Sequence, residues 1–543
     1  MIKANTYFAI AFSIAVSIGI TFTGCISDNP RDRVSSDEAF SSPTSLYLNT
    51  VGMLYNYIGG STDGSGLQGT YRGVYDYNTF TTDEAILPVR GGDWYDGGFW
   101  KYLYEHRWSA DDQELYNLWN YLFKVVVHCN EALANLQEHK RLLNDAQWHS
   151  YTAEVRAVRA MYYYYLVDLF GNVPLITDNQ TNVSQLTNAR RSEVFRFAFN
   201  ELQQALPYLS TAHSNLQGEY YGRLTRPVAC FLLAKLSLNA EVFTCDNPVK
   251  YPRKQGKDIY FTVNGAQLNA WETVIYYCRQ IEDMGYQLEP DYATNFKVHN
   301  ETSRENIFTI PMDKILYPNQ FQYLFRSRHY NHGKALGLGS ENGACATVST
   351  VRAFDYDTPQ IDKRYALNFY SDTILVDGDT VRLDDGTPLV YQPLVVQPDL
   401  TFSPYVKTGG VRMAKYEIDR KGLADGKLQD NDIVLYRYAD VLLMMAEAKV
   451  RNGQSGQSEL NNVRARVGMM PRVATLDNIL AERRLELMWE GWRRQDLIRF
   501  SLFTEAYDMR QPVENEHTGF TMLFPIPSRA IRSGGKLKPN SDF

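Results

Sequence analysis

Apolar residues recur every three or four positions along several long stretches of this chain, which is the period of an amphipathic helix. Over residues 111–136 the apolar stripe includes Leu115 and Leu118. The same period predicts further helices over 154–170, 192–209, 225–243, 271–284, 436–452, 458–467 and 476–500. Ser192 and Thr225 are of the residue types that favour the N-cap position, so each is expected to begin its helix.

The helical period largely stops between about 286 and 435. In this region TILVDGDTVRL predicts a β-hairpin that turns at Asp377-Gly378, because Asp-Gly suits the backbone of a two-residue turn. The helices on either side form successive pairs with short connections, which is typical of tetratricopeptide-type scaffolds and also occurs in ordinary α-domains. The chain is therefore expected to be mainly α, with a loop-rich part that contains a few short β-hairpins.

The first 25 residues have the pattern of an export signal. An apolar run from about Phe8 to Phe22 is too short and too close to the terminus for a transmembrane helix. Gly24 then precedes Cys25, as in a bacterial lipoprotein signal, although Phe22 stands where such signals usually have Leu. We expect cleavage before Cys25 and acylation of its thiol, which would anchor the chain to a membrane. The alternative is an ordinary secretory signal with an incidental cysteine.

Composition and charge limit the classes of partner. Of the 543 residues 22% are charged, and the formal net charge of −7 argues against nucleic acid, whose binding needs a basic surface. The six cysteines form no CxxC pair, so buried free thiols are expected for most of them rather than a zinc ribbon. Aromatic residues reach 13%, which fits either a recognition surface or a helical core rich in tyrosine.

Two loops concentrate aromatic and polar side chains. The first is TTDEAILPVRGGDWYDGGFW, residues 81–100, and the second is YPNQFQYLFRSRHYNHGKALGLGSENG, residues 317–343. Glycines in such loops let the backbone approach a ligand closely. For each aromatic residue the alternative is local packing that holds the loop together, and Phe325 in particular is expected in the core.

Six segments, read in order along the chain, form a specific series. They are EVRAVRAMYYYYLVDLFGNVPLIT (154–177), GRLTRPVACFLLAKLSLN (222–239), LYRYADVLLMMAEAKVRNG (435–453), LNNVRARVGM (460–469), ERRLELMWEGWRRQDLIRF (482–500) and LFPIPSRAI (523–531). Together with the lipoprotein signal they resemble the SusD/RagB family. Most charged residues in them are expected to pair within and between helices: Arg156, Arg159, Glu482, Arg483, Glu486, Glu490, Arg493 and Asp496.

The resemblance implies an outer-membrane lipoprotein of Bacteroidetes-type bacteria that binds glycans at the cell surface without cleaving them. Proteins of this family act as a lid on a TonB-dependent transporter of the SusC type and pass oligosaccharides to it. The implied fold is a helical scaffold of tetratricopeptide-like pairs that supports a less regular part.

The implied organisation has three regions. They are a signal peptide over 1–24, a lipidated cysteine with a flexible linker over 25–44, and a single domain over 45–543. Within the domain the scaffold is expected over about 105–285 and 430–505, and the loop-rich ligand-binding part over about 60–104 and 286–430.

The two aromatic loops occupy regions that the resemblance assigns to the glycan site. Sugars have apolar C–H faces and polar edges, so their sites combine aromatic platforms with amide, carboxylate and guanidinium groups. The expected ligand-binding residues are Arg90, Asp93, Trp94, Tyr95, Asp96 and Trp100 in the first loop, and Tyr323, His329, Tyr330, Asn331, Glu341 and Asn342 in the second. Trp94 is expected to matter more than Trp100.

The motifs HExxH, GxSxG and the P-loop are absent, and we expect no catalytic residues and no cofactor. Carboxylates do stand in pairs, such as Asp93 with Asp96 and Asp384 with Asp385, so a lipid-anchored glycoside hydrolase is the alternative. A protein-interaction scaffold without glycan binding is a third. DGDTVRLDDG is not expected to be an EF-hand, because Val381 stands where that loop needs an oxygen ligand. No metal site is predicted, and a structural calcium elsewhere stays open.

Overall fold

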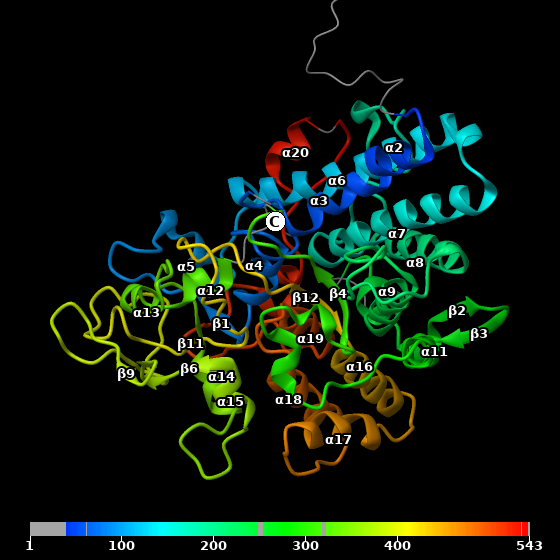
Figure 1. Cartoon of the computed structure of the whole chain (residues 1–543). Helices are drawn as coiled ribbons and strands as arrows, with labels where there is room; N and C mark the ends of the chain where they lie inside the picture. The colour runs from blue at the N-terminus through cyan, green and yellow to red at the C-terminus, as the bar shows by residue number, and fades with distance from the viewer. Residues whose placement is uncertain (1–39, 61, 248–252, 318–321, 534, 541–543) are drawn as a thin grey trace, which may run out of the picture.

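The long helices pack side by side as an array at the right of Figure 1, in a computed structural model that describes residues 40–60, 62–247, 253–317, 322–533 and 535–540. The array consists of α6 (Gln113–Glu138), α7 (Asp145–Leu169), α8 (Arg191–Ala205), α9 (Arg226–Leu238), α11 (Ala270–Asp283), α16 (Tyr438–Arg451) and α17 (Gln457–Arg466). Each helix contacts the next in this order. Because α11 contacts α16, the array is continuous although residues 284–437 lie between these two helices in the sequence.

The predicted mainly α fold is confirmed, with differences at several helix ends. Helix α7 begins earlier than predicted, where the side chain of Asn144 accepts a hydrogen bond from the Gln147 backbone N–H. Thr225 is the N-cap of α9, as predicted. The prediction for Ser192 is wrong, because α8 begins at Arg191 and Ser192 lies in its first turn.

Two predicted helices are interrupted. The segment 225–243 divides at Asn239 into α9 and α10 (Ala240–Phe243). The segment 476–500 divides into α18 (Leu476–Glu486) and α19 (Arg493–Arg499), and Trp489 and Gly491 between them have positive φ angles of 67° and 75°. Helical backbone requires negative φ, so the chain must leave the helix here, which apolar periodicity alone does not indicate.

The remaining elements are short, and most of them belong to the loop-rich part at the left of Figure 1. The helices are α2 (Pro43–Tyr47), a π-helical turn (Leu48–Gly52), α3 (Met53–Gly59), α4 (Val74–Thr79), α5 (Phe99–Tyr104), α12 (Gln322–Ser327), α13 (Tyr330–Leu336), α14 (Val348–Ala353), α15 (Arg364–Asn368) and α20 (Ser528–Ser533). None of the helices in the described ranges is long and apolar enough to cross a bilayer.

The strands of the described residues pair only in twos, all antiparallel. The pairs are β1 (Ala85–Ile86) with β5 (Cys345–Ala346), β2 (Tyr260–Val263) with β3 (Ala266–Asn269), β4 (Asn306–Ile310) with β12 (Ile433–Arg437), β6 (Phe369–Tyr370) with β11 (Arg412–Met413), β7 (Asp372–Thr373) with β10 (Val390–Tyr391), and β8 (Leu375–Val376) with β9 (Asp379–Thr380). The β8–β9 pair confirms the predicted hairpin, with positive φ at Asp377 and Gly378.

The first described helix begins one residue before the predicted end of the N-terminal linker. Ser42 caps α2, so Pro43 and Thr44, which were expected in the linker, are helical. Cys25 and the signal peptide lie outside the described residues.

Much of the aromatic content belongs to one apolar core. Helix α7 buries four consecutive tyrosines, Tyr162 to Tyr165, and they pack with residues of α6, α9 and β12 in the same cluster. The cysteines from Cys129 onward are buried free thiols, as predicted. The core therefore uses tyrosine as a large apolar residue, while a second set of aromatic side chains stays exposed in the loops.

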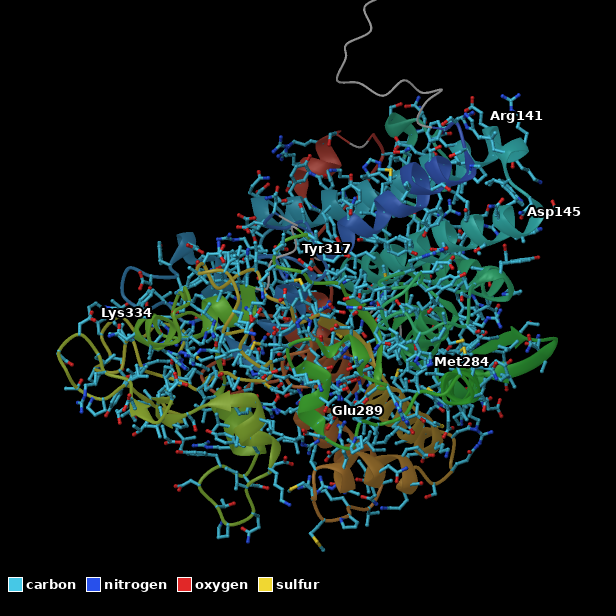
Figure 2. All side chains as sticks on the ribbon, viewed as in Figure 1. Arg141, Asp145, Met284, Glu289, Tyr317 and Lys334 are labelled. Atoms are coloured by element: carbon cyan, nitrogen blue, oxygen red, sulfur yellow. The ribbon has the colours of Figure 1, made fainter. Side chains whose placement is uncertain are left out.

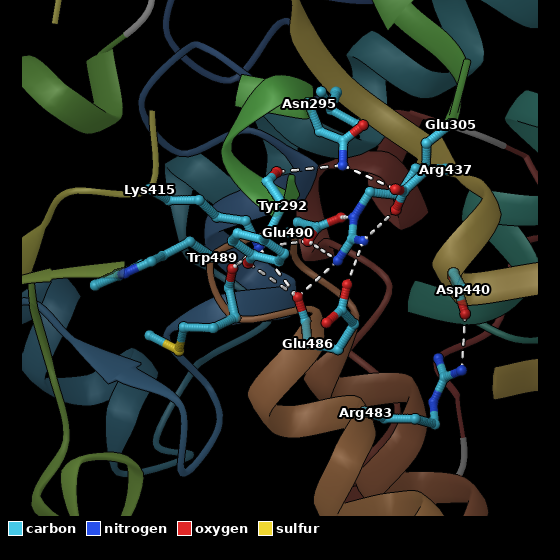
Figure 3. Close-up of polar contacts among 12 residues, drawn as sticks. Tyr292, Asn295, Glu305, Lys415, Arg437, Asp440, Arg483, Glu486, Trp489 and Glu490 are labelled. Atoms are coloured by element: carbon cyan, nitrogen blue, oxygen red, sulfur yellow. Dashed lines mark hydrogen bonds and ion pairs between the residues drawn. The ribbon is translucent and has the colours of Figure 1, made fainter. Parts of the chain in front are cut away.

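A buried ion-pair cluster lies where the loop-rich part meets the C-terminal helices (Figure 3). Arg437 is at its centre and donates to Glu305 at 2.8 Å, to Glu486 at 2.6 Å and to Glu490 at 2.7 Å. The cluster contains five cations (Arg364, Lys415, Arg437, Arg464 and Arg466) and five carboxylates (Glu305, Asp362, Glu482, Glu486 and Glu490). The charges therefore balance in the interior.

A second buried group connects the array to α18 and α19. Lys235 pairs with Asp440 at 2.6 Å, and Arg483 bridges Asp440 and Asp496 at 2.7 and 2.8 Å. The architectural role predicted for the charged motif residues is confirmed, because Arg156 and Arg159 also pair with Glu201, and Arg493 pairs with Asp83.

Removal of one charge from the first cluster should be strongly destabilising. Arg437→Met keeps the side chain's bulk but leaves one buried carboxylate uncompensated, so we expect a loss of about 3–5 kcal/mol in the free energy of unfolding. Asp377→Asn is the matched control, because it removes an exposed pair with Arg420 and should cost at most about 1 kcal/mol. Urea unfolding measures both; equal shifts in the two variants would contradict the role of the cluster.

Acid should weaken the fold through the same kind of contact. Burial alone would raise the pKa of Glu447, but the positive charges of Arg499 and Arg451 lower it from 4.5 to about 2. The folded chain therefore keeps Glu447 ionised at a pH where the unfolded chain binds a proton, so its contribution to stability is lost as the pH falls from about 4.5 towards 2. Unfolding midpoints at pH 5, 4 and 3 should fall less steeply in Glu447→Gln than in the natural chain.

Candidate functional site

The two aromatic loops, far apart in the sequence, meet in the loop-rich part of the molecule. Strands β1 and β5 pair Ala85 with Ala346 and so place the loops next to each other. The guanidinium of Arg90 then donates to the carbonyl of Gly343 at 3.2 Å. Figure 2 labels Lys334 of α13 in this part, at the opposite end of the molecule from Arg141 at the α6–α7 connection.

Trp94 connects the two loops directly. Its indole Nε1 donates to the backbone carbonyl of Glu341 at 2.9 Å, and its ring lies over Gly343, where a Cβ would come within 2.8 Å of it. Trp94 has a φ of 63°, a conformation that costs a bulky residue about 1–3 kcal/mol unless its surroundings fix it. The ring is half-buried, so one part of it packs between the loops and another part reaches solvent.

A polar and aromatic surface lies beside this connection. The Tyr330 hydroxyl donates to the Asp93 carboxylate at 2.7 Å, and the amide of Asn331 donates to Asp384 at 3.0 Å. Tyr95 and Tyr330 are 59% and 38% exposed. We call Asp93, Trp94, Tyr95, Tyr330 and Asn331 the recognition face, because they combine accessible ring surface with carboxylate and amide groups.

Burial excludes four of the expected residues from direct contact with a ligand in this conformation. Trp100 is fully buried against Phe80 and Phe99, and its indole N–H donates to Asp96 at 2.8 Å. Its expected role as a platform is therefore replaced by packing. Arg90, His329 and Asn342 are buried as well.

The other expected residues lie around the recognition face or outside the described side chains. Asp96 is exposed and pairs with Arg72 at 2.8 Å, whose guanidinium lies over the Trp100 ring. Glu341 is half-buried, and its carboxylate accepts a hydrogen bond from Tyr71, while burial raises its pKa. Tyr323 belongs to α12, but its side chain lies outside the described part of the structure. Phe325 is in the core, as predicted.

A third loop, residues 392–410, lies within the predicted ligand-binding part, but none of its residues was among the predicted contacts. It is attached to the first loop by hydrogen bonds between Val89 and Leu400 at 2.8 Å and between Val89 and Pro398 at 3.0 Å. Phe402 at its tip is 99% exposed and Tyr405 is 40% exposed. The signal available in the sequence was the pair of aromatics in FSPY, within a segment that has no helical period.

Two buried histidines lie under the recognition face. Burial and the neighbouring charges of Arg412, Lys407 and Arg90 lower the pKa of His329 to about 4. Burial, with Arg328 nearby, lowers the pKa of His332 to about 3. Both rings are therefore neutral at physiological pH, and His329 uses its Nδ1 to cap α13 by accepting from the Asn331 backbone N–H.

The carboxylates of the TTDE segment serve the framework. Asp83 is buried and receives two hydrogen bonds from Arg493 at 2.7 and 2.9 Å. Burial raises the pKa of Glu84 to about 7, and its carboxylate accepts the Trp489 backbone N–H at 2.9 Å. Within the described residues no three His, Cys, Asp or Glu side chains gather as a metal site.

Comparison with known proteins agrees with this architecture. The model of the SusD family matches residues 285–542, and a second family model, described as starch-binding and associating with the outer membrane, matches residues 67–238. The starch-binding protein SusD of Bacteroides thetaiotaomicron is 22% identical over 519 residues, which cover 88% of this chain and 86% of that protein. SusD-like protein P38 of Formosa agariphila is 32% identical over 157 residues, 26% of this chain and 30% of that protein.

Solved structures show the same fold. Surface glycan-binding protein A from Bacteroides thetaiotaomicron superposes with a TM-score of 0.70 at 20% identity, covering 93% of this chain and 100% of that one. Its complex with laminarihexaose gives a TM-score of 0.67 at 19% identity, covering 90% and 98%. The ordered motifs, the helical array and both family models lead to one conclusion: this chain belongs to the SusD/RagB family.

Proposed function

We propose that this chain is a cell-surface lipoprotein that binds oligosaccharides or polysaccharides without cleaving them and delivers them to a SusC-like TonB-dependent transporter in the outer membrane. Relatives named for binding starch or laminarin support the glycan as ligand. The family model described as associating with the outer membrane supports the location.

The observation that carries the proposal is the recognition face itself. Two loops separated by more than two hundred residues converge so that Tyr95 and Tyr330 keep ring surface exposed next to Asp93 and Asn331. Aromatic rings stack on the C–H faces of sugars, and carboxylate and amide groups accept and donate to their hydroxyls. The core buries Trp100 of the same segment, whereas these rings stay accessible.

Delivery to a transporter requires a ligand that can leave. A face made of exposed loop side chains is open, so we expect affinities between about micromolar and millimolar, or about −8 to −4 kcal/mol. The lipid on Cys25 would keep the binding domain at the membrane, where the transporter lies. No cofactor takes part in this proposal.

Two single substitutions test the face. Trp94→Ala removes the ring between the loops, and Tyr330→Ala removes an exposed platform, so each should lower glycan affinity at least tenfold, about 1.4 kcal/mol. A glycan array identifies the ligand and calorimetry measures its affinity. Tyr260→Ala is the matched control, because Tyr260 is similarly exposed but lies on the β2–β3 hairpin of the helical part. Unchanged binding in both folded loop variants would refute the assignment of the site.

A glycoside hydrolase is the competing function, since Asp93, Asp96 and Asp384 are exposed carboxylates in the loop-rich part. The purified chain, incubated with each polysaccharide that it binds, should release no reducing ends above a buffer control. Sustained release that stops in an Asp93→Asn variant would establish catalysis and overturn the non-catalytic proposal.

A further inference from the structure

Three guanidinium groups with no carboxylate partner lie under the recognition face. Arg90 is 3% exposed, and Arg328 and Arg412 are fully buried. Within the described residues none of the three forms an ion pair, and burial lowers the pKa of each of them. A buried cation without an anion is costly, because its hydration is lost and no opposite charge replaces it.

Two of these guanidinium groups, those of Arg90 and Arg412, donate to backbone carbonyls, which take the place of the water molecules that would solvate them at the surface. Arg90 donates to the carbonyls of Val406 and Gly409 at 3.0 and 2.9 Å, and Arg412 donates to those of Gly409 and Gly410, both at 2.7 Å. These contacts stabilise the third loop, but a carbonyl is a dipole and does not neutralise a charge.

Arg328 is in a different position from both. All three of its guanidinium nitrogens are buried and have no hydrogen-bond partner within the described part of the chain. Other buried arginines have partners: Arg326, two residues earlier, donates to both oxygens of Asp76. Arg191 in α8 forms no ion pair among the described residues, but it donates to the carbonyls of Val167 and Val242. Arg328 therefore differs from these arginines in having neither a carboxylate nor a carbonyl partner among the described residues.

The unpaired charges lie next to the residues that would touch a ligand. Arg90 precedes the turn that presents Asp93, and Arg328 directly precedes His329 and Tyr330. Lys407 in the third loop is exposed, and its backbone carbonyl accepts a hydrogen bond from Arg412 at 3.2 Å. Its charge, opposed by that of Asp384, helps to lower the pKa of His329. The positive charge therefore extends from the interior to the surface beside Tyr330.

Acidic groups at the same surface do not cancel this charge. Asp93 accepts the Tyr330 hydroxyl and Asp384 accepts the Asn331 amide, and both carboxylates are exposed to solvent. Water and salt screen exposed charges, whereas a charge in the low-dielectric interior acts at longer range. The side of the face towards Lys407 should therefore attract an anion.

We propose that the ligand of the recognition face is an acidic oligosaccharide, whose carboxylate or sulfate ester lies beside Lys407 and His329 and interacts with the unpaired charges of Arg90, Arg328 and Arg412. This inference rests on the proposed function and narrows its ligand class. A sugar ring stacked on Tyr330 would carry its acid group towards the third loop, so recognition would combine apolar contact with charge. A neutral sugar at the same place would stack on Tyr330 but would gain nothing from the positive charges.

The test compares acidic polysaccharides with the same polymers after their acid groups are masked. Polygalacturonate and its methyl ester are the carboxylate pair, and a sulfated galactan and its desulfated form are the sulfate pair. Starch and laminarin are the neutral references. Migration of the full chain through native gels that contain each polymer gives the relative affinities.

We expect one acidic polymer to bind at least about tenfold more tightly than its masked form, a difference of about 1.4 kcal/mol. This advantage should shrink as NaCl rises from about 20 to about 500 mM, because the Debye length falls. If a masked or neutral polymer binds as tightly as every acidic one, and binding is lost in Tyr330→Ala, the inference is overturned and the proposed function stands. If no polymer binds at all, the proposed function fails as well.

Two variants separate the charge from the stacking surface. Lys407→Gln removes the exposed cation, and Arg328→Met removes the unpaired one while keeping an apolar side chain of similar length in the interior. Each should bring the ratio of acidic to masked affinity closer to one without abolishing binding. Lys257→Gln, an exposed lysine near α11, is the matched control and should leave the ratio unchanged. An unchanged ratio in both folded charge variants would overturn the inference.

Discussion

The ion pairs of Arg437 with Glu305, Glu486 and Glu490 are the contact on which the rest of the structure depends. Arg437 ends β12, Glu305 directly precedes β4, and Glu486 and Glu490 lie at the break between α18 and α19. One guanidinium therefore connects three distant parts of the sequence. The partners of a buried charge must be placed accurately, because a buried charge without an opposite charge beside it costs several kcal/mol of folding free energy. The cluster therefore fixes how the loop-rich part sits on the helical array.

The recognition face takes its position from this framework in two steps. Asp83 and Glu84 attach the start of the first loop to Arg493 and to the backbone of Trp489, close to Glu490 of the cluster. Beyond that point the loops hold one another through main-chain carbonyls and the indole of Trp94. Buried ion pairs therefore hold the base of the loops, and hydrogen bonds to backbone carbonyls hold them near the surface. The exposed side chains contribute little to holding the loops in place.

The sequence predicted the elements whose signal is long and periodic, namely the helices of the array, and the resemblance predicted which loops would meet. It ranked Trp94 above Trp100 but kept both as ligand contacts, because both stand in the same glycine-rich segment and only packing against Phe80 and Phe99 buries Trp100. It also passed over Phe402, whose exposure depends on where the third loop leaves Val89. The sequence shows which side chains a loop has. The contacts that hold the loop to the rest of the molecule decide which of those side chains reach solvent.

The anchoring of the loops by main-chain atoms has a practical consequence for protein engineering. Hydrogen bonds to the carbonyls of Gly343, Val406 and Gly409 do not depend on the side chains at those positions. Tyr95 and Phe402 can thus be randomised in a display library while the backbone that carries them stays in place. A chain of this kind offers a scaffold from which binders for other sugars can be selected.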